Sequence, residues 1–283
     1  MRDHVCIIIP TRDPLRARVL VQQCTAHGWS DCVVVHPGAS IHLDGAVSIG
    51  TEVLLSPAAA RNCGARATQK PFLCFLDDDV ILHGDAITRL VAFCMAEMHV
   101  AVGPLLADRP TDGYWRRCMH RVMAEGQFVE SRTAEPAALM SMLLVVRRDA
   151  FWSAGGFDEA YADPAGEDTA LTMRMATYGT LGVDRSTSIY HDPHPDGCWP
   201  ASRRLWRYGS AWAFLSCTHQ SRTTQIQHLP RPLRYLCIAV VPLLAGIDAL
   251  RHSSVTYWPG YTWLRICWYV GVLTTPPLDR VTP

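Results

Sequence analysis

The chain has 283 residues with 26 basic and 26 acidic side chains, so its formal net charge at pH 7 is zero. Hydrophobic residues make up 49% and charged residues 18%, which excludes an intrinsically disordered chain and a general nucleic-acid binder. The length suffices for one large domain or two modest ones with a buried core, and it excludes a disulfide-stapled miniprotein.

The eleven cysteines predict buried thiols rather than a disulfide framework or a zinc ribbon. Their number is odd, and no two of them have the CxxC spacing. The apolar block Val5–Ile9 is too short for the hydrophobic region of a secretory signal. We therefore expect the chain to fold in a reducing, cytoplasmic compartment.

Short apolar runs alternate with helical patterns over the first 110 residues. The runs Val5–Ile9, Cys32–Val35 and Phe72–Leu76 predict strands, and Leu15–His27 and Ala58–Thr68 predict helices. This alternation predicts a Rossmann-like α/β fold with a mostly parallel sheet flanked by helices. Ligands of such sheets bind at the carboxyl ends of the strands.

The middle of the chain predicts further strand and helix pieces around a glycine-rich loop. Residues 137–150 are typical of a strand pair or a strand–helix junction. The glycine-rich loop is Gly155–Glu159, and a helix is expected over Glu167–Met175.

The last third of the chain is apolar, aromatic and basic. Residues 197–247 contain six arginines and no acidic residue. The apolar stretches Tyr235–Ile247 and Tyr257–Leu273 are too short or too interrupted to predict a membrane span. They predict an apolar, aromatic-rich helical extension with two open interpretations: peripheral membrane contact through residues 230–275, or packing on the sheet or on the second subunit of a homodimer.

Three aspartates, Asp77, Asp78 and Asp79, directly follow the apolar run that ends at Leu76. Adjacent carboxylates repel one another, and a cation such as Mg²⁺ or Mn²⁺ relieves that repulsion. If the strand continued, Asp77 and Asp79 would share one face. The alternative is a solvated turn that caps the next helix.

Further candidates follow in the second half of the chain. Glu167 and Asp168 either cap the predicted helix or present a base in a cleft. His191 is a candidate metal ligand beside the aspartates, because imidazole and carboxylate together suit Mn²⁺. Arg204 and Arg207 lie one helical turn apart and form either a diphosphate clamp or a solvated basic face.

Seven motifs follow one another in an order that resembles the family 2 nucleotide-sugar glycosyltransferases, which have the GT-A fold. They are Ile-Ile-Ile-Pro10-Thr11, Ser-Pro57-Ala-Ala-Ala-Arg61-Asn62-Cys-Gly64, Asp77-Asp-Asp79, Gly155-Gly-Phe-Asp-Glu159, Gly166-Glu-Asp168, Tyr190-His191 and Arg204-x-x-Arg207-Tyr208. The resemblance covers residues 5–210. It implies a GT-A domain over residues 1–210, with a nucleotide-sugar half of about 1–110 and an acceptor half of about 111–210, followed by the extension 211–283.

This resemblance implies an inverting, metal-dependent enzyme that moves a single sugar from a nucleoside diphosphate sugar to a hydroxyl of a lipid, peptide or natural product. Asp168 would be the general base with Glu167 in support, and Asp79 and His191 would hold Mn²⁺ or Mg²⁺. The donor would be bound by Pro10, Thr11, Arg12, Arg61, Asn62, Asp77, Asp78, Arg204 and Arg207. The implied location is cytoplasmic, peripheral on the inner face of the membrane.

Two departures from the family pattern and two alternative functions accompany this interpretation. The Asn or Asp that the family usually has after the Thr of the first strand is changed, since the run here is Thr11-Arg12-Asp13-Pro14. His36 stands where the family commonly has an aspartate that contacts the base, which leaves the nucleobase open. A nucleotidyltransferase would have a glycine-rich phosphate loop with a lysine, but Pro10–Leu15 contains no glycine and Lys70 is the only lysine. A catalytically inactive binding or scaffold domain would lack motif carboxylates, and all of them are present here.

Overall fold

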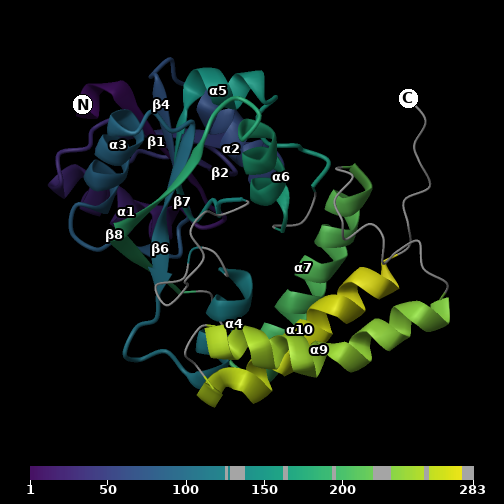
Figure 1. The fold of residues 1–283 in the computed structure, drawn as a ribbon. Coiled ribbons are helices and arrows are strands. Elements are labelled where there is room, and N and C mark those ends of the chain that lie inside the picture. Colours follow the sequence, from purple (N-terminus) through teal and green to yellow (C-terminus); the bar gives the residue numbers. More distant parts are fainter. Residues whose placement is uncertain are drawn as a thin grey trace. The chain divides into compact units, whose positions relative to one another are not determined.

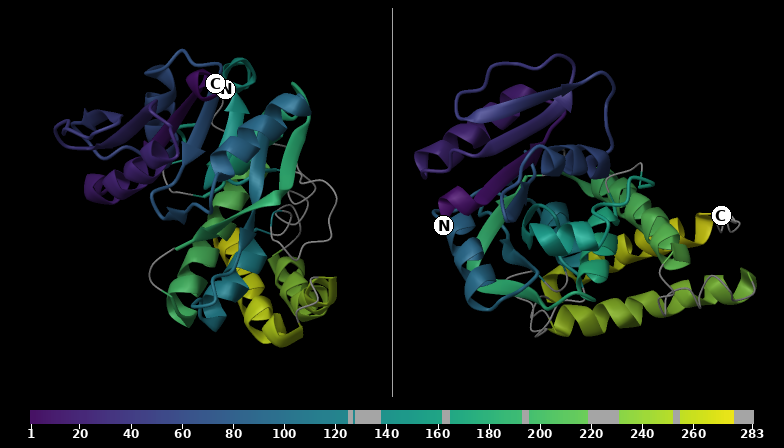
Figure 2. Two further views of the ribbon diagram at one scale, coloured as in Figure 1. Left: turned by 90° about the vertical axis from the view of Figure 1, so that its left-hand side faces the viewer. Right: turned by 90° about the horizontal axis from the view of Figure 1, so that it is seen from above.

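The computed structural model describes residues 1–124, 127, 138–161, 165–192, 196–218, 231–251 and 255–275 (Figures 1 and 2). Contacts within the chain divide it into two compact units. The first comprises Met1–Ala107 and Ala134–Asp192, and the second comprises Asp108–Thr133 and Pro193–Pro283. Residues 193–210, which we assigned to the catalytic domain, share a unit with the C-terminal helices.

A mixed eight-stranded sheet forms the first unit, in the order β3-β2-β1-β4-β7-β6-β8-β5. The strands are β1 (Val5–Pro10), β2 (Cys32–Pro37), β3 (Ala46–Thr51), β4 (Phe72–Leu76), β5 (Val80–Ile81), β6 (Ala101–Ala107), β7 (Leu143–Arg147) and β8 (Leu181–His191). β1 pairs in parallel with β2 and with β4, β2 pairs in parallel with β3, and β6 pairs in parallel with β8. β7 is antiparallel to both β4 and β6. The predicted α/β fold is therefore confirmed.

The described part of the first unit has five α-helices, and two of them start at side-chain caps that the sequence provides. They are α1 (Pro14–Ala26), α2 (Pro57–Arg66), α3 (Ala86–Ala96), α5 (Arg148–Ser153) and α6 (Glu167–Met175). The side chains of Asp13 and Ser56 accept backbone N–H groups at the starts of α1 and α2, and a proline follows each cap. Segment 137–150 contains the strand–helix junction from β7 to α5, one of its two predicted forms.

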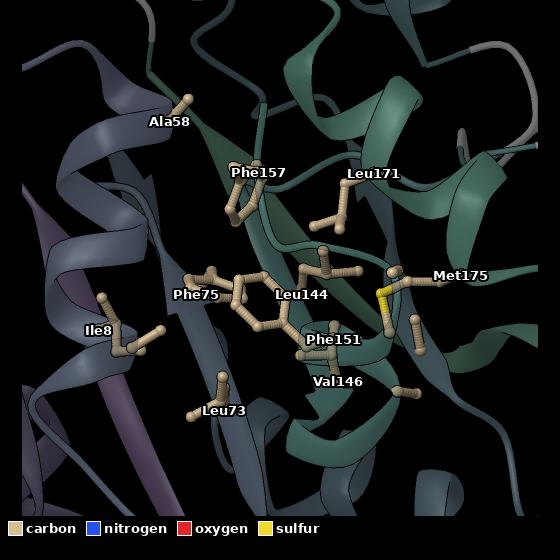
Figure 3. Close-up of a cluster of buried hydrophobic side chains, with 14 of the residues drawn as sticks. Ile8, Ala58, Leu73, Phe75, Leu144, Val146, Phe151, Phe157, Leu171 and Met175 are labelled. Carbon is tan, nitrogen blue, oxygen red and sulfur yellow. The ribbon is translucent and has the colours of Figure 1, made fainter. Parts of the chain in front are cut away.

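The core of the first unit is built around three phenylalanine rings. The ring centroid of Phe75 on β4 lies 5.3 Å from that of Phe151 and 5.0 Å from that of Phe157. Figure 3 shows these rings between Ile8 on one side and Leu171 on the other. Burial of each such side chain stabilises the fold by about 1.5–3 kcal/mol. This packing anchors β4 just before its aspartates.

The carboxyl ends of β1, β4 and β8 lie at one edge of the sheet. Because β7 is antiparallel to both of its neighbours, β6 runs in the direction of β4, and β8 runs parallel to β6. Thr11, Asp77 and His191 therefore emerge at the same edge. This is the place where open α/β sheets bind their ligands.

Four helices make up the second unit: α4 (Tyr114–Met123), α7 (Cys198–Thr218), α9 (Arg231–Arg251) and α10 (Trp258–Thr274). α10 packs against the other three around buried residues that include Cys118, Leu205, Tyr261 and Leu264 (Figure 1). The predicted C-terminal helices are thus confirmed. In the described part of the chain, no helix combines the length and the hydropathy that crossing a membrane requires.

Two glycines allow α7 and α10 to approach closely. A Cβ added at Gly209 would overlap the backbone carbonyl of Trp268, and one added at Gly271 would overlap that of Trp206. Because backbone cannot move aside as a flexible side chain does, we expect Gly209→Ala to lower the free energy of unfolding of the second unit by about 1–3 kcal/mol. Urea unfolding that is monitored by tryptophan fluorescence measures this loss.

Gly246→Ala on α9 is the matched control. The atom that an added Cβ would approach most closely is the indole Nε1 of Trp258, at 3.3 Å, which is a side-chain contact. Alanine also favours the helix over glycine by up to about 1 kcal/mol, so this variant should be neutral or more stable. Equal losses in both variants would show that the close approach of α7 and α10 is not the cause.

Candidate active site

The three aspartates after β4 lie in a turn rather than on a continued strand. β4 ends at Leu76, and the N–H of Val80 donates to the carbonyl of Asp77 at 3.3 Å. The strand alternation that was expected to place Asp77 and Asp79 on one face therefore does not apply. Each aspartate instead has a different side-chain partner.

Asp78 joins the end of β4 to the loop after β1. Its carboxylate accepts a hydrogen bond from the hydroxyl of Thr11. Burial and the charge of Asp79 raise the pKa of Asp78, and the Thr11 hydrogen bond opposes this rise. Pro10 and Arg12 flank this contact, half-buried and exposed respectively. Nucleotide binding by these loop residues stays a prediction.

Asp79 and His191 form the candidate metal pair. The Oδ2 atom of Asp79 lies 3.2 Å from Nε2 of His191, because Val80 on β5 pairs with His191 on β8. The side chain of Asp79 is 25% exposed and that of His191 is 6% exposed. A carboxylate beside an imidazole suits Mn²⁺, so Asp79 and His191 would be the protein ligands of such an ion. The donor set thus fits the predicted cation.

Arg61 connects the aspartate turn to the start of α6. Its Nη2 lies 2.6 Å from Oδ1 of Asp77, and its Nη1 lies 2.9 Å from Oε1 of Glu167. Burial alone would lower the pKa of Arg61, but the two carboxylates outweigh burial and raise it. Burial also raises the pKa of Asp77 against the opposing charge of Arg61. The guanidinium therefore acts as a buried bridge between two carboxylates.

Glu167 and Asp168 are adjacent in the sequence but differ in environment. Burial and the charge of Asp168 raise the pKa of Glu167 to about 7, although Arg61 opposes the rise. Asp168 is half-buried, and its two carboxylate oxygens accept backbone N–H groups of Ser141 at 3.1 Å and Thr169 at 2.7 Å. The structure therefore separates a carboxylate that is paired with arginine from one that is oriented by backbone.

Asn62 fixes the glycine-rich loop. Its Nδ2 donates to the carbonyl of Phe157 and to Oε1 of Glu159, both at 2.8 Å, and its Oδ1 accepts the N–H of Phe157 at 3.0 Å. Asn62 and Arg61 were expected near the donor from the resemblance alone. In the structure their polar groups bind other parts of the first unit, and no signal in the sequence indicated these partners.

Arg204 and Arg207 belong to the second unit. They line a pocket of about 470 Å³ near the start of α7. Their expected contact with a diphosphate stays a prediction. His36, the departure noted at the second strand, is buried, with its Nε2 2.8 Å from the hydroxyl of Ser48.

The sequence did not single out a second cluster with metal-ligating side chains. Asp108, Asp112 and His120 of the second unit lie close enough together to share an ion. Arg121 lies 2.6 Å from Asp108, and Arg116 lies 3.1 Å from Asp112. Arginines therefore already neutralise both carboxylates, which favours an ion-pair network over a metal site.

Comparison with known sequences supports the family resemblance. Residues 51–153 match the model of glycosyl transferase family 2. The chain is 30% identical over 124 residues to the N-acetylglucosaminyl-diphospho-decaprenol L-rhamnosyltransferase of Mycobacterium tuberculosis (strain ATCC 25618 / H37Rv), and 31% identical over 155 residues to the succinoglycan biosynthesis protein ExoM of Rhizobium meliloti (strain 1021). The match to the rhamnosyltransferase covers 43% of this chain and 37% of that relative. The match to ExoM covers 52% of this chain and 48% of that relative, so the chain spans less than half of either relative.

Solved structures share the fold. A mannosyltransferase from Pyrobaculum calidifontis, PcManGT, in complex with GDP-Man and Mn²⁺, aligns with a TM-score of 0.56 at 17% identity over 95% of this chain and 85% of its own. GalNAc-T7 with UDP, GalNAc and Mn²⁺ aligns with a TM-score of 0.52 at 12% identity over 90% of this chain and 55% of its own. The predicted GT-A fold and the resemblance to family 2 glycosyltransferases are confirmed.

Proposed function

We propose that this chain is an inverting, metal-dependent glycosyltransferase that moves a single sugar from a nucleoside diphosphate sugar to an acceptor hydroxyl. One observation carries the proposal: the Asp79–His191 pair and the Arg61 bridge to α6 both start from the aspartate turn at the carboxyl edge of the sheet. A candidate cation site and a candidate base are thereby connected through one buried framework.

The chemistry assigned to this site is a single displacement. Asp168 takes the proton of the acceptor hydroxyl, and the oxygen forms a bond to the anomeric carbon of the donor. The bond between that carbon and the diphosphate oxygen breaks, and the nucleoside diphosphate leaves with the electron pair. The N–H groups of Ser141 and Thr169 support this role because they fix the orientation of the carboxylate.

Asp79 and His191 are the residues that would hold Mn²⁺ or Mg²⁺. A divalent cation at this position supplies positive charge for the departing diphosphate. Glu167 is a positioning residue in this scheme, since its carboxylate is paired with Arg61. Arg204 and Arg207 remain candidates for diphosphate binding by resemblance.

We infer a lipid-linked diphosphate sugar as the acceptor class. The name of the mycobacterial relative describes such an acceptor, N-acetylglucosaminyl-diphospho-decaprenol. Helix α9 exposes an apolar stripe at helical spacing that includes Leu236, Val240, Leu243 and Leu250. A stripe of this kind suits contact with a lipid surface, which supports a peripheral location on the inner face of the membrane through residues 230–275.

Nucleotide titration tests the donor site. We expect calorimetry with UDP, GDP, dTDP and ADP to detect one nucleotide that binds in the presence of Mn²⁺. A chelator should abolish this binding. Asp79→Ala should weaken that binding at least about tenfold, because one of two protein ligands is removed. Asp85→Ala, which removes an exposed aspartate paired with Arg89 on α3, is the matched control and should bind normally. Absence of nucleotide binding under both conditions would favour the scaffold interpretation.

A further inference from the structure

A basic pocket lies at the N-terminus of α7, entirely within the second unit. Four arginines line it, Arg116, Arg203, Arg204 and Arg207, together with a single acidic residue, Asp196. Its volume of about 470 Å³ is that of a small-molecule site. Arg116 is paired with Asp112 outside this lining, but Arg203 and Arg204 still outnumber Asp196, and this excess of positive charge predicts an anionic ligand.

The one acidic residue of the pocket does not neutralise its arginines. The Oδ2 atom of Asp196 lies so close to Gly113, the N-cap residue of α4, that a Cβ there would overlap it. The other oxygen accepts the N–H of Gly197 at 2.7 Å. The carboxylate is thus placed at the positive end of α4, where the helix dipole favours it. Within the described ranges, no carboxylate pairs with Arg203 or Arg204.

The pocket combines two kinds of anion-binding group. Gly197, Trp199 and Ala201 at the start of α7 line it, and the positive end of the helix dipole attracts phosphate. Arg116 is held in place by Asp112 at 3.1 Å. Guanidinium groups bind phosphate oxygens with paired hydrogen bonds, so several of them around one cavity suit a diphosphate.

The exposed surface near the start of α7 is aromatic and basic. Trp199 is 78% exposed, and Arg203 and Arg207 follow it at intervals of four residues and are also exposed. Tryptophan and arginine in such a row are typical of an interface between water and lipid headgroups. Because α9 of the same unit exposes its leucine stripe, this unit offers an anion pocket and apolar surface on one framework.

We propose that this pocket binds the diphosphate group of a lipid-linked substrate. Arg203 and Arg116, which lie outside the motifs of the family resemblance, are assigned to this group together with the start of α7. Arg204 and Arg207 line the same pocket, so in this proposal they serve the lipid diphosphate rather than the donor diphosphate that the resemblance assigns to them. A nucleoside diphosphate is the other source of the same chemistry. The assignment of the lipid diphosphate to the sugar acceptor rests on the proposed glycosyl transfer, whereas diphosphate binding by the pocket does not.

Titration of the full chain with farnesyl diphosphate tests the proposal, with farnesol and the donor nucleotide as comparison ligands. We expect farnesyl diphosphate to bind without Mn²⁺ and farnesol to bind at least tenfold more weakly. Arg203→Gln should weaken farnesyl diphosphate binding about tenfold and leave metal-dependent nucleotide affinity within about twofold. Arg18→Gln, which removes an exposed arginine from α1 of the first unit, is the matched control and should change neither affinity.

The outcomes separate the pocket from the proposed reaction. Unchanged farnesyl diphosphate affinity in Arg203→Gln would overturn the proposal. Equal weakening of farnesyl diphosphate and nucleotide would also overturn it, because the pocket would then serve the donor. If Arg203→Gln weakens farnesyl diphosphate binding although no nucleotide binds to the wild-type chain, the pocket assignment stands and the proposed glycosyl transfer fails.

Discussion

Asp168→Asn is expected to lower the rate of sugar transfer by about 10²–10⁴-fold, the range in which a general base contributes to catalysis. An amide cannot take the proton of the acceptor hydroxyl, so the loss should appear in kcat. Nucleotide affinity should stay within about twofold, because the proposed cation ligands Asp79 and His191 are unchanged. Initial rates at saturating donor and calorimetry with the donor nucleotide measure the two quantities.

Asp149→Asn provides a matched control for this prediction. Asp149 is the second residue of α5, as Asp168 is of α6, and each accepts the backbone N–H of the residue that follows it. The control removes the same charge from the same helical position. Asp149 differs in that it lies at the surface, where it is paired with Arg147. The transfer rate of the control should be unchanged. If Asp168→Asn lost transfer and nucleotide affinity equally, the assignment of Asp168 as the base would be wrong.

The parts of the fold that could be predicted are those whose signals are local. β1 and β4 are continuous apolar runs, and both are buried in the middle of the sheet. α2 begins at a serine cap followed by a proline, which marks its start within a few residues. Signals of this kind depend only on neighbouring residues, so they identify an element without knowledge of the tertiary structure.

Other strands depend on partners that are distant in the sequence. β3 is an edge strand with little buried surface, and β8 carries polar residues such as Asp184 and Arg185, so neither shows a clear apolar pattern. The antiparallel direction of β7 is likewise decided by the strands beside it. Its apolar run could be recognised, but its orientation could not.

In the candidate site too, some features could be predicted from local sequence and others depend on residues far apart in the chain. The aspartates and His191 were found from residue type and order, and β-sheet pairing brings Asp79 and His191 together. The bridge of Arg61 to Glu167 joins residues 106 positions apart. Nothing in the local sequence distinguishes an arginine that binds a ligand from one that neutralises two buried carboxylates. That distinction requires the tertiary packing that brings α2, the turn after β4 and the start of α6 together.

Arg61→Met is expected to lower the free energy of unfolding of the first unit by about 3–5 kcal/mol, the usual cost of removing one partner from a buried ion pair. The substitution leaves Asp77 and Glu167 without their cation, at side-chain exposures of 24% and 5%. Urea unfolding that is monitored by hydrogen exchange of the β4 amides reports on this unit. Arg66→Met, five residues further along α2, removes an exposed partner of Glu159 and should cost less than about 1 kcal/mol.

The loss in Arg61→Met should depend on pH with a defined sign. The pKa of Glu167 is raised to about 7 in the folded chain, so folding favours its protonated form, and its contribution to stability falls as pH rises from about 4.5 to about 7. Removal of Arg61 takes away the charge that opposes this rise, so the variant should lose more stability at pH 8 than at pH 5. Adding Glu167→Gln to Arg61→Met should remove most of that difference. The same loss at both pH values would mean that packing around Arg61, rather than its charge, holds the aspartate turn against α6.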